Sequence, residues 1–227
     1  MNQERKRRQA HRLHEQQLLN DILSMPEPPK FHLTMRSFDE FVRNDPGSNR
    51  VSQALSLTTM SLIYPGLYLG GVGAALDIET LTKEGISDIL CVMNNKPHAK
   101  TLMAYKTAGI PNHLFLQIAV GDKTPIMPLF EPSRKFIHDA LTNGRKVLVH
   151  CHAGKERSPT LVMYALLHYL YEHDPIARTF VKATGANVLD YVWTCIEMRR
   201  RCICPPDPYR TELKQAEVKL KVQFDDC

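Results

Sequence analysis

The sequence predicts an α/β fold: a central, mostly parallel sheet of about five strands, flanked by helices. The first observation is that short apolar segments alternate with longer helix-prone segments between residues 61 and 222. The second is that Gly85, Gly109 and Gly144 each follow a helix-prone segment, as glycine commonly does at a helix C-terminus. The third is that the apolar run Val147–Val149 leads through a short loop into another helix-prone segment.

Strands are expected where short apolar runs stand between turn residues. They fall at 62–69, as two short strands around Pro65 and Gly66, and at 89–92, 113–118 and 147–149. Helices are expected where apolar residues recur with helical spacing. They fall at 74–84, 100–107, 129–142, 158–171, 176–183, 188–201 and 209–222.

The first 60 residues differ in character from the rest. Residues 3–24 contain no glycine or proline, which favours a helix. The prolines within 26–29 end that helix and indicate a linker. Ser37–Glu40 has the form of a capping box, which predicts a short helix through residue 42. We therefore expect residues 1–60 to be a basic helical N-terminal extension and linker, and a functional domain to follow.

The composition is that of an ordinary globular protein, with 43% hydrophobic and 23% charged residues in a chain of 227. No apolar run reaches the roughly 20 residues that a transmembrane helix needs, and the N-terminus lacks the apolar stretch of a secretory signal. We therefore expect a cytoplasmic protein whose six cysteines are reduced. The basic cluster Arg5–Arg8 leaves the nucleus open as a second location.

The charge of the chain restricts its partners only loosely. A formal net charge of +5 suits anionic substrates or a lipid surface and does not require nucleic acid. In the N-terminal extension, Arg5–Arg8 precede an apolar patch at 18–23. We interpret this segment as a solvated helix, or alternatively as a docking element for a partner protein or an acidic lipid surface.

The segment from Val147 to Ser158 holds the residues that point to chemistry. Five residues, with Gly154 among them, separate Cys151 from Arg157, and a helix is expected directly afterwards. Backbone N–H groups in a loop before a helix N-terminus bind anions. Such a site stabilises a phosphate dianion and a cysteine thiolate alike, and a planar guanidinium can bind two phosphate oxygens. The pattern therefore predicts a cysteine nucleophile that attacks phosphate esters.

This arrangement, His-Cys-x5-Arg-Ser after an apolar strand, resembles the signature of the cysteine-dependent protein tyrosine phosphatases. Further segments resemble the dual-specificity branch of that superfamily: Tyr64–Gly70, Gly85–Leu90, Ile118–Asp122 and 136–151. The resemblance covers roughly residues 61–220. It implies the protein tyrosine phosphatase-like fold, with residues 61–222 as the catalytic domain, and hydrolysis through a phosphocysteine intermediate.

The resemblance also implies a role for each site residue. Cys151 is expected to be the nucleophile, Arg157 the phosphate clamp, Asp122 the general acid, and Ser158 a hydroxyl that assists breakdown of the phosphocysteine. His150 is expected to order the loop by hydrogen bonding. The phosphate-binding residues are expected to be His152, Ala153, Gly154, Lys155, Glu156 and Arg157. Neither a metal nor another cofactor is expected, because the loop supplies the charge stabilisation that a metal would give.

Several carboxylates and one further cysteine leave alternatives open. Glu131 and Asp139 are less suitable acids than Asp122, because both fall in a predicted helix. Cys91 is expected to be a buried core cysteine, or alternatively to form a reversible disulfide with Cys151 under oxidation.

The loop departs from the common dual-specificity pattern at Glu156, where that pattern has a small residue. A carboxylate beside a thiolate disfavours the thiolate unless the carboxylate points outward or pairs with Lys155. His152, Lys155 and Lys123 would give the rim basic character, and this combination also resembles loops of phosphoinositide phosphatases.

Three functions are consistent with these sequence features. The leading one is a protein phosphatase that acts on phosphotyrosine and on phosphoserine or phosphothreonine, because the chain lacks the long insertions that deepen a tyrosine-only pocket. The second is a phosphatase for phosphoinositides or other non-protein phosphate monoesters. The third is a weakly active module that binds phosphorylated proteins.

Overall fold

The computed structural model describes residues 33–44, 56–119, 124–175, 177 and 187–225. The predicted N-terminal helix at 3–24 and the proline linker lie outside the described residues, as does nearly all of the predicted helix at 176–183.

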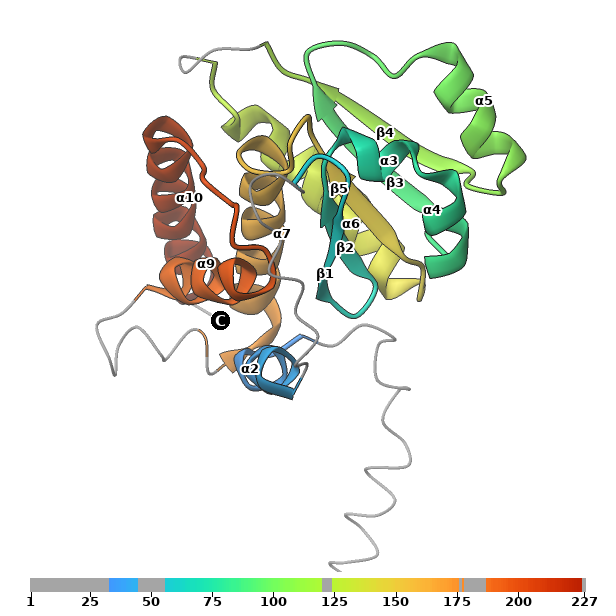
Figure 1. The fold of residues 1–227 in the computed structure, drawn as a ribbon. Helices are drawn as coiled ribbons and strands as arrows, with labels where there is room; N and C mark the ends of the chain where they lie inside the picture. Colours follow the sequence, from blue (N-terminus) through green and yellow to red (C-terminus); the bar gives the residue numbers. More distant parts are fainter. Residues whose placement is uncertain (1–32, 45–55, 120–123, 176, 178–186, 226–227) are drawn as a thin grey trace, which may run out of the picture. The chain divides into compact units, whose positions relative to one another are not determined.

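The described residues form one sheet of five strands, as predicted (Figure 1). The strands are β1 (Met60–Tyr64), β2 (Leu67–Gly70), β3 (Asp88–Met93), β4 (Asn112–Gln117) and β5 (Val147–His150), and their order in the sheet is β1-β2-β5-β3-β4. β1 runs antiparallel to β2, and all other neighbours are parallel. The prediction of a mostly parallel sheet is therefore confirmed.

The central position of β5 explains its unbroken apolar sequence. Leu148 pairs with Tyr68 of β2 on one side and with Ile89 of β3 on the other. Val147–Val149 are fully buried, because helices cover both faces of the sheet at this strand. The strand ends at the edge of the sheet where the carboxyl ends of the parallel strands meet, which is the usual ligand edge of such folds.

Helices flank the sheet in two layers (Figure 1). One layer contains α3 (Val72–Leu76), α4 (Ile78–Glu84) and α5 (Ala99–Thr107). The other contains α6 (Phe130–Thr142), which follows the short helix η1 (Met127–Leu129), and α7 (Arg157–His173). Two C-terminal helices, α9 (Val188–Arg199) and α10 (Asp207–Asp225), pack against α7.

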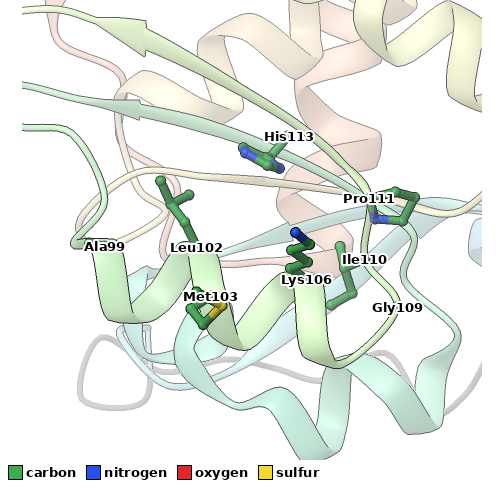
Figure 2. A pocket seen from close by; sticks show the side chains of 8 residues that line it. All are labelled: Ala99, Leu102, Met103, Lys106, Gly109, Ile110, Pro111 and His113. Carbon is green, nitrogen blue, oxygen red and sulfur yellow. The ribbon is translucent and has the colours of Figure 1, made fainter.

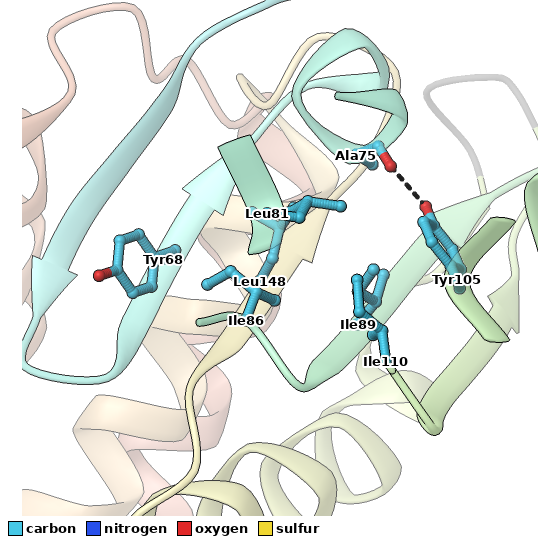
Figure 3. Close-up of a cluster of buried hydrophobic side chains, with 8 residues drawn as sticks. All are labelled: Tyr68, Ala75, Leu81, Ile86, Ile89, Tyr105, Ile110 and Leu148. Carbon is cyan, nitrogen blue, oxygen red and sulfur yellow. Dashed lines mark hydrogen bonds between the residues drawn. The ribbon is translucent and has the colours of Figure 1, made fainter. Parts of the chain in front are cut away.

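A compact apolar cluster joins the first helix layer to the sheet (Figure 3). Tyr68, Ile89 and Leu148 project from three neighbouring strands. Ala75 and Tyr105 come from α3 and α5, and the Tyr105 hydroxyl donates a hydrogen bond of 2.8 Å to the Ala75 carbonyl. The alternation of side chains along β5 therefore places Leu148 in this cluster and its two valine neighbours on the α7 side.

The predicted single helix at 74–84 is wrong, because Asp77 divides it into α3 and α4. The Asp77 carboxylate accepts a hydrogen bond of 3.0 Å from the backbone N–H of Thr80 and so caps α4. Hydrogen bonds from the side chain and the N–H of Thr80 lower the pKa of Asp77. The predicted helix end at Gly85 is confirmed, since this residue adopts the left-handed conformation at φ 71°.

The helix predicted from Ser37 begins earlier, as α2 (Met35–Asn44). Thr34 provides the cap: its Oγ1 accepts from Ser37 N at 2.9 Å, and Ser37 Oγ accepts from Thr34 N at 2.8 Å. Ser37 therefore fills the third helical position of a reciprocal capping box, where Glu is more common.

α2 packs onto the rest of the compact unit through a buried apolar face. Phe38 is fully buried and meets the rings of Tyr64 and Tyr191 edge to face. The Met35 N–H donates a hydrogen bond of 2.8 Å to the carboxylate of Asp174. The compact unit consequently begins at Leu33, ahead of the start predicted at residue 61.

Candidate active site

The loop between β5 and α7 contains the predicted nucleophile and the predicted phosphate-binding residues. It starts at Cys151, directly after the end of β5, and α7 begins at Arg157. Pro159 falls in the first turn of α7, where proline costs no helical hydrogen bond. The loop therefore joins the C-terminal end of the central strand to a helix N-terminus, as the sequence predicted.

The carbonyl oxygens of this loop bind groups outside it. The hydrogen bonds run from Val72 N to His152 O (2.8 Å), from Arg200 Nη2 to Ala153 O (3.1 Å), from Arg200 Nε to Gly154 O (2.9 Å), from Cys204 N to Lys155 O (2.7 Å) and from Thr160 N to Glu156 O (3.2 Å). All described peptide bonds are trans, so each following N–H points opposite to its carbonyl. The N–H groups of residues 153–157 consequently face the inner side of the loop, as an anion cradle requires.

The sulfur of Cys151 lies within this cradle. Cys151 is 2% exposed, and its Sγ accepts hydrogen bonds from Gly154 N and from Ser158 Oγ, both at 3.2 Å. The structure thus brings Cys151, Gly154 and Ser158 together.

Arg157 has the character expected of an anion ligand. Its Nη1 is buried and has no hydrogen-bond partner within the part of the chain that the structure describes. A buried guanidinium N–H without a partner is costly. An oxyanion held by the loop would satisfy it.

His150 supports the loop from the end of β5. It is 3% exposed, and its Nδ1 lies 3.3 Å from the carbonyl oxygen of Cys151. Burial lowers the pKa of His150 to about 4, although the contact with the Cys151 carbonyl acts in the opposite direction. The ring is therefore neutral at pH 7, and Nδ1 is the nitrogen that carries the proton to donate to that oxygen.

The rim consists of the side chains that the loop turns toward solvent. His152 and Glu156 are exposed, while Ala153 and Lys155 are half-buried. Among the described residues, Glu156 makes no ion pair with Lys155. Of the two arrangements considered from the sequence, solvent exposure of the carboxylate is the one found.

The predicted general acid Asp122 and the rim residue Lys123 lie outside the described residues. The other carboxylates considered have partners elsewhere. Glu131 accepts hydrogen bonds from Arg134 and from the Tyr164 hydroxyl, and Asp139 pairs with Arg145. Both belong to α6, as predicted.

Cys91 is a buried cysteine of β3, paired in register with His150. Burial and the neighbouring Cys151 raise the pKa of Cys91 to about 12. The Cys91 thiol is therefore protonated at neutral pH.

Two supporting residues, Arg200 and Glu212, were not identified from the sequence. Arg200 binds two loop carbonyls, as described above. Glu212 of α10 accepts hydrogen bonds from the N–H groups of Ile126 and Met127, at 2.9 Å from Ile126, and so anchors the chain that follows the predicted acid loop. Nothing in the local sequence marks either residue, because their partners lie far away in the chain.

A separate pocket of about 650 Å³ lies between α5 and β4 (Figure 2). Its lining is mainly apolar and includes Leu102, Met103 and Ile110, together with the polar side chains of Lys106 and His113. None of the loop residues lines it.

The described part of the chain contains no cluster of three or more His, Cys, Asp or Glu side chains suited to a metal ion. None of its helices is long and apolar enough to span a bilayer.

The sheet topology and the loop at the end of β5 define the class of protein tyrosine phosphatase-like α/β proteins. Over residues 67–219 the chain matches the dual specificity phosphatase catalytic domain, and it belongs to that family. The resemblance inferred from the sequence is therefore confirmed.

Individual relatives show the same family relationship. The chain is 32% identical to the tyrosine-protein phosphatase yvh1 of Schizosaccharomyces pombe over 63% of its own length and 42% of the relative. It is 31% identical to the serine/threonine/tyrosine-interacting protein of Mus musculus, over 73% of this chain and 69% of that protein. The solved structure of the human tyrosine phosphatase-like serine/threonine/tyrosine-interacting protein superposes with a TM-score of 0.54 at 30% identity, covering 70% of this chain and 96% of that chain. The chain thus spans less than half of one curated relative and about two thirds of another.

Proposed function

We propose that this protein is a cysteine-dependent dual-specificity protein phosphatase, which hydrolyses phosphotyrosine and phosphoserine or phosphothreonine. The observation that carries the proposal is the position of Cys151 Sγ: it accepts hydrogen bonds from Gly154 N and Ser158 Oγ inside a loop whose N–H groups face inward. A nucleophile and an oxyanion cradle are thereby combined.

In the first step, Cys151 Sγ attacks phosphorus, a P–S bond forms and the P–O bond to the leaving group breaks. The inward N–H groups and Arg157 bind the non-bridging oxygens. Asp122, assigned from the sequence, donates its proton to the leaving oxygen.

In the second step, water attacks phosphorus while Asp122 takes up a proton from that water, and the P–S bond breaks. Ser158 Oγ, 3.2 Å from Sγ, stabilises the departing thiolate.

The direct test of the proposal is turnover of an aryl phosphate. Cys151→Ser should abolish turnover and retain binding of orthovanadate. Arg157→Lys should also lower turnover severely, because an ammonium cannot reproduce the bidentate fork of the guanidinium. Cys204→Ser, at an exposed cysteine near the loop, is the matched control and should retain activity. Residual turnover of Cys151→Ser within about tenfold of wild type would remove Cys151 as the nucleophile.

The assignment of Asp122 is tested by leaving-group dependence. Asp122→Asn should slow hydrolysis of an ester with a poor leaving group by about 10²–10⁴-fold, and that of an activated ester much less. Glu156→Gln is the comparison. If Glu156→Gln shows this dependence and Asp122→Asn does not, the loop carboxylate is the acid.

The substrate class is tested against phosphoinositides. We expect higher specificity constants for phosphopeptides, because the exposed Glu156 repels the additional phosphates of an inositol headgroup and so opposes Lys155. A phosphoinositide preference that collapses in Lys155→Ala would establish the second function instead.

The third function, capture of phosphorylated proteins with little turnover, is favoured by one observation: some relatives bear the name of an interacting protein. Against it, Cys151 and Arg157 are both present in the loop. A protein that binds phosphopeptides tightly and does not turn over aryl phosphates would support it.

A further inference from the structure

Arg200 directly follows α9 and is completely buried. Its Nε donates to Gly154 O at 2.9 Å, and its Nη2 donates to Ala153 O at 3.1 Å. One guanidinium thus bridges two consecutive carbonyls of the phosphate-binding loop. The planar, rigid fork of guanidinium donors suits this pair of acceptors.

The other side of the guanidinium binds the chain that leads into β1. Nη1 donates to Thr59 O at 3.1 Å and to Ser61 Oγ at 3.2 Å, and Nη2 also donates to Ser56 O at 2.6 Å. All of these acceptors are neutral, and Arg200 has no carboxylate partner among the described residues. Burial lowers the pKa of Arg200, but arginine stays protonated in proteins. A full positive charge therefore lies on the carbonyl side of the loop, opposite the inward-facing N–H groups.

The contacts form a continuous chain from this charge to the sulfur. The Ala153 carbonyl, which accepts from Arg200, belongs to the same peptide group as the Gly154 N–H, which donates to Cys151 Sγ. In the next peptide group, the Gly154 carbonyl accepts from Arg200 and the Lys155 N–H faces the inner side. A hydrogen bond to a carbonyl strengthens the N–H of the same peptide as a donor.

We propose that Arg200 is the positioning residue of the anion cradle: it fixes and polarises the peptide groups 153–154 and 154–155 so that their N–H groups bind the thiolate and the phosphate. Arg200 touches neither substrate nor sulfur and acts through these two peptide groups. The inference deepens the proposed function and rests on it for the identity of the anion.

The test measures inhibition by orthovanadate, aryl phosphate turnover and thermal stability in four variants. Arg200→Met and Arg200→Lys should weaken inhibition by orthovanadate at least tenfold and lower kcat by about 10–100-fold. Methionine has no donor, and the three donors of an ammonium cannot replace the five hydrogen bonds of the guanidinium. Ser61→Ala removes one contact on the far side of the guanidinium and should change vanadate inhibition less than twofold.

Arg199→Met is the matched structural control. The Arg199 side chain donates to Leu62 O at 2.8 Å and stacks over Phe41, away from the loop carbonyls. It should lower thermal stability without changing vanadate inhibition. If folded Arg200→Lys or Arg200→Met is inhibited like wild type, or if Arg199→Met weakens vanadate equally, the proposal is overturned.

A measurement on the wild-type protein does not depend on the folding of any variant. In NMR spectra, the Arg200 Nε–H resonance should shift when orthovanadate binds, and that of Arg199 should not. An unmoved Arg200 resonance would contradict the proposal. Because the NMR titration follows anion binding without turnover, a wild type that binds vanadate without hydrolysing esters would refute the proposed function, and the Arg200 resonance would still decide this inference.

Discussion

At Gly154, the loop requires the absence of a side chain. The residue has φ +66°, and a Cβ there would lie 2.4 Å from Gly70 O and 2.6 Å from Gly70 C. Both are backbone atoms of the neighbouring strand, so neither can move without shifting β2. The loop conformation and the packing of β2 against β5 are therefore fixed by the same residue.

We predict that Gly154→Ala abolishes the proposed phosphatase activity and destabilises the fold by about 2–5 kcal/mol, the sum of left-handed strain and overpacking. Gly109→Ala is the control, since Gly109 has φ +73° and a Cβ added there would meet no atom within 4 Å. It should cost only the strain of about 1–2 kcal/mol and retain activity. Urea unfolding and aryl phosphate turnover check both. Equal losses in the two variants would show that the close approach to Gly70 is unimportant.

His150 gives the stability of the protein a pH dependence. Above pH 6.5 the ring is neutral in both the folded and the unfolded chain, so it contributes no dependence there. As the pH falls from 6.5 to about 4, the unfolded state takes up a proton that the buried ring does not, and stability decreases. The shift of pKa corresponds to a loss of about 3 kcal/mol once the pH is below 4.

We therefore predict that wild type loses about 2 kcal/mol more stability than His150→Asn between pH 6.5 and pH 5. The side-chain amide introduced by this substitution can still donate to the Cys151 carbonyl and does not titrate. Comparing the pH dependence of the free energy of unfolding in wild type and in His150→Asn cancels the contributions of the other histidines. Parallel stability profiles would mean that His150 titrates normally in the folded protein.

At the residue scale, the sequence indicates proximity where contacts are local. Cys151, Gly154 and Ser158 are separated by a few residues, and a strand–loop–helix unit brings them together without help from the rest of the chain. Arg200 contacts Gly154 across 46 positions, and Glu212 contacts Ile126 across 86. No periodicity or motif in the local sequence indicates such contacts.

At the scale of elements, the errors occurred at helix ends. Asp77 has helix-compatible neighbours, and its side chain caps α4 at the point where the chain turns between α3 and α4. Thr34 caps α2, and Ser37 pairs with it from within the helix. Short polar side chains serve equally well at a cap and in a first turn, so the sequence did not distinguish the two.

The N-terminus of α9 depends on a buried carboxylate of α10. Glu217 is 3% exposed and accepts hydrogen bonds from Val188 N, Leu189 N and the Tyr171 hydroxyl. It acts as a helix cap supplied from another helix. Arg200 lies at the other end of α9. By fixing the N-terminus of α9, Glu217 therefore also helps to position Arg200 against the phosphate-binding loop.

We predict that Glu217→Ala destabilises the protein by about 2–4 kcal/mol, because it leaves several buried donors without an acceptor. Glu197→Ala, at an exposed position of α9, should change stability by less than about 0.5 kcal/mol. Chemical denaturation measures both. A loss in Glu217→Ala no larger than that in Glu197→Ala would mean that water replaces the carboxylate.

At the scale of the whole molecule, the alternation of strands and helices was sufficient to predict the sheet and its mostly parallel pairing. It did not indicate that α2 belongs to the same compact unit, because the segment is short and separated from β1 by residues without a regular pattern. The packing of Phe38 against Tyr64 and Tyr191 is a tertiary contact that only the folded chain reveals.

We predict that Phe38→Ala lowers the stability of the whole domain by about 3–5 kcal/mol, as expected for a fully buried ring. Glu40→Ala, on the exposed face of α2, should have an effect below about 0.5 kcal/mol. A single cooperative unfolding transition at a lower denaturant midpoint is the expected result. An unchanged midpoint for Phe38→Ala would show that α2 is dispensable to the domain.

The hydrogen bonds that hold the loop pass through the carbonyl oxygens of His152, Lys155 and Glu156, while their side chains take no part in them. Replacing these side chains therefore leaves the acceptors in place. We therefore expect substitutions of these rim side chains to change which phosphate ester the loop prefers, without altering the backbone geometry of the loop. Directed evolution toward a new substrate should consequently find its tolerated substitutions at these three positions.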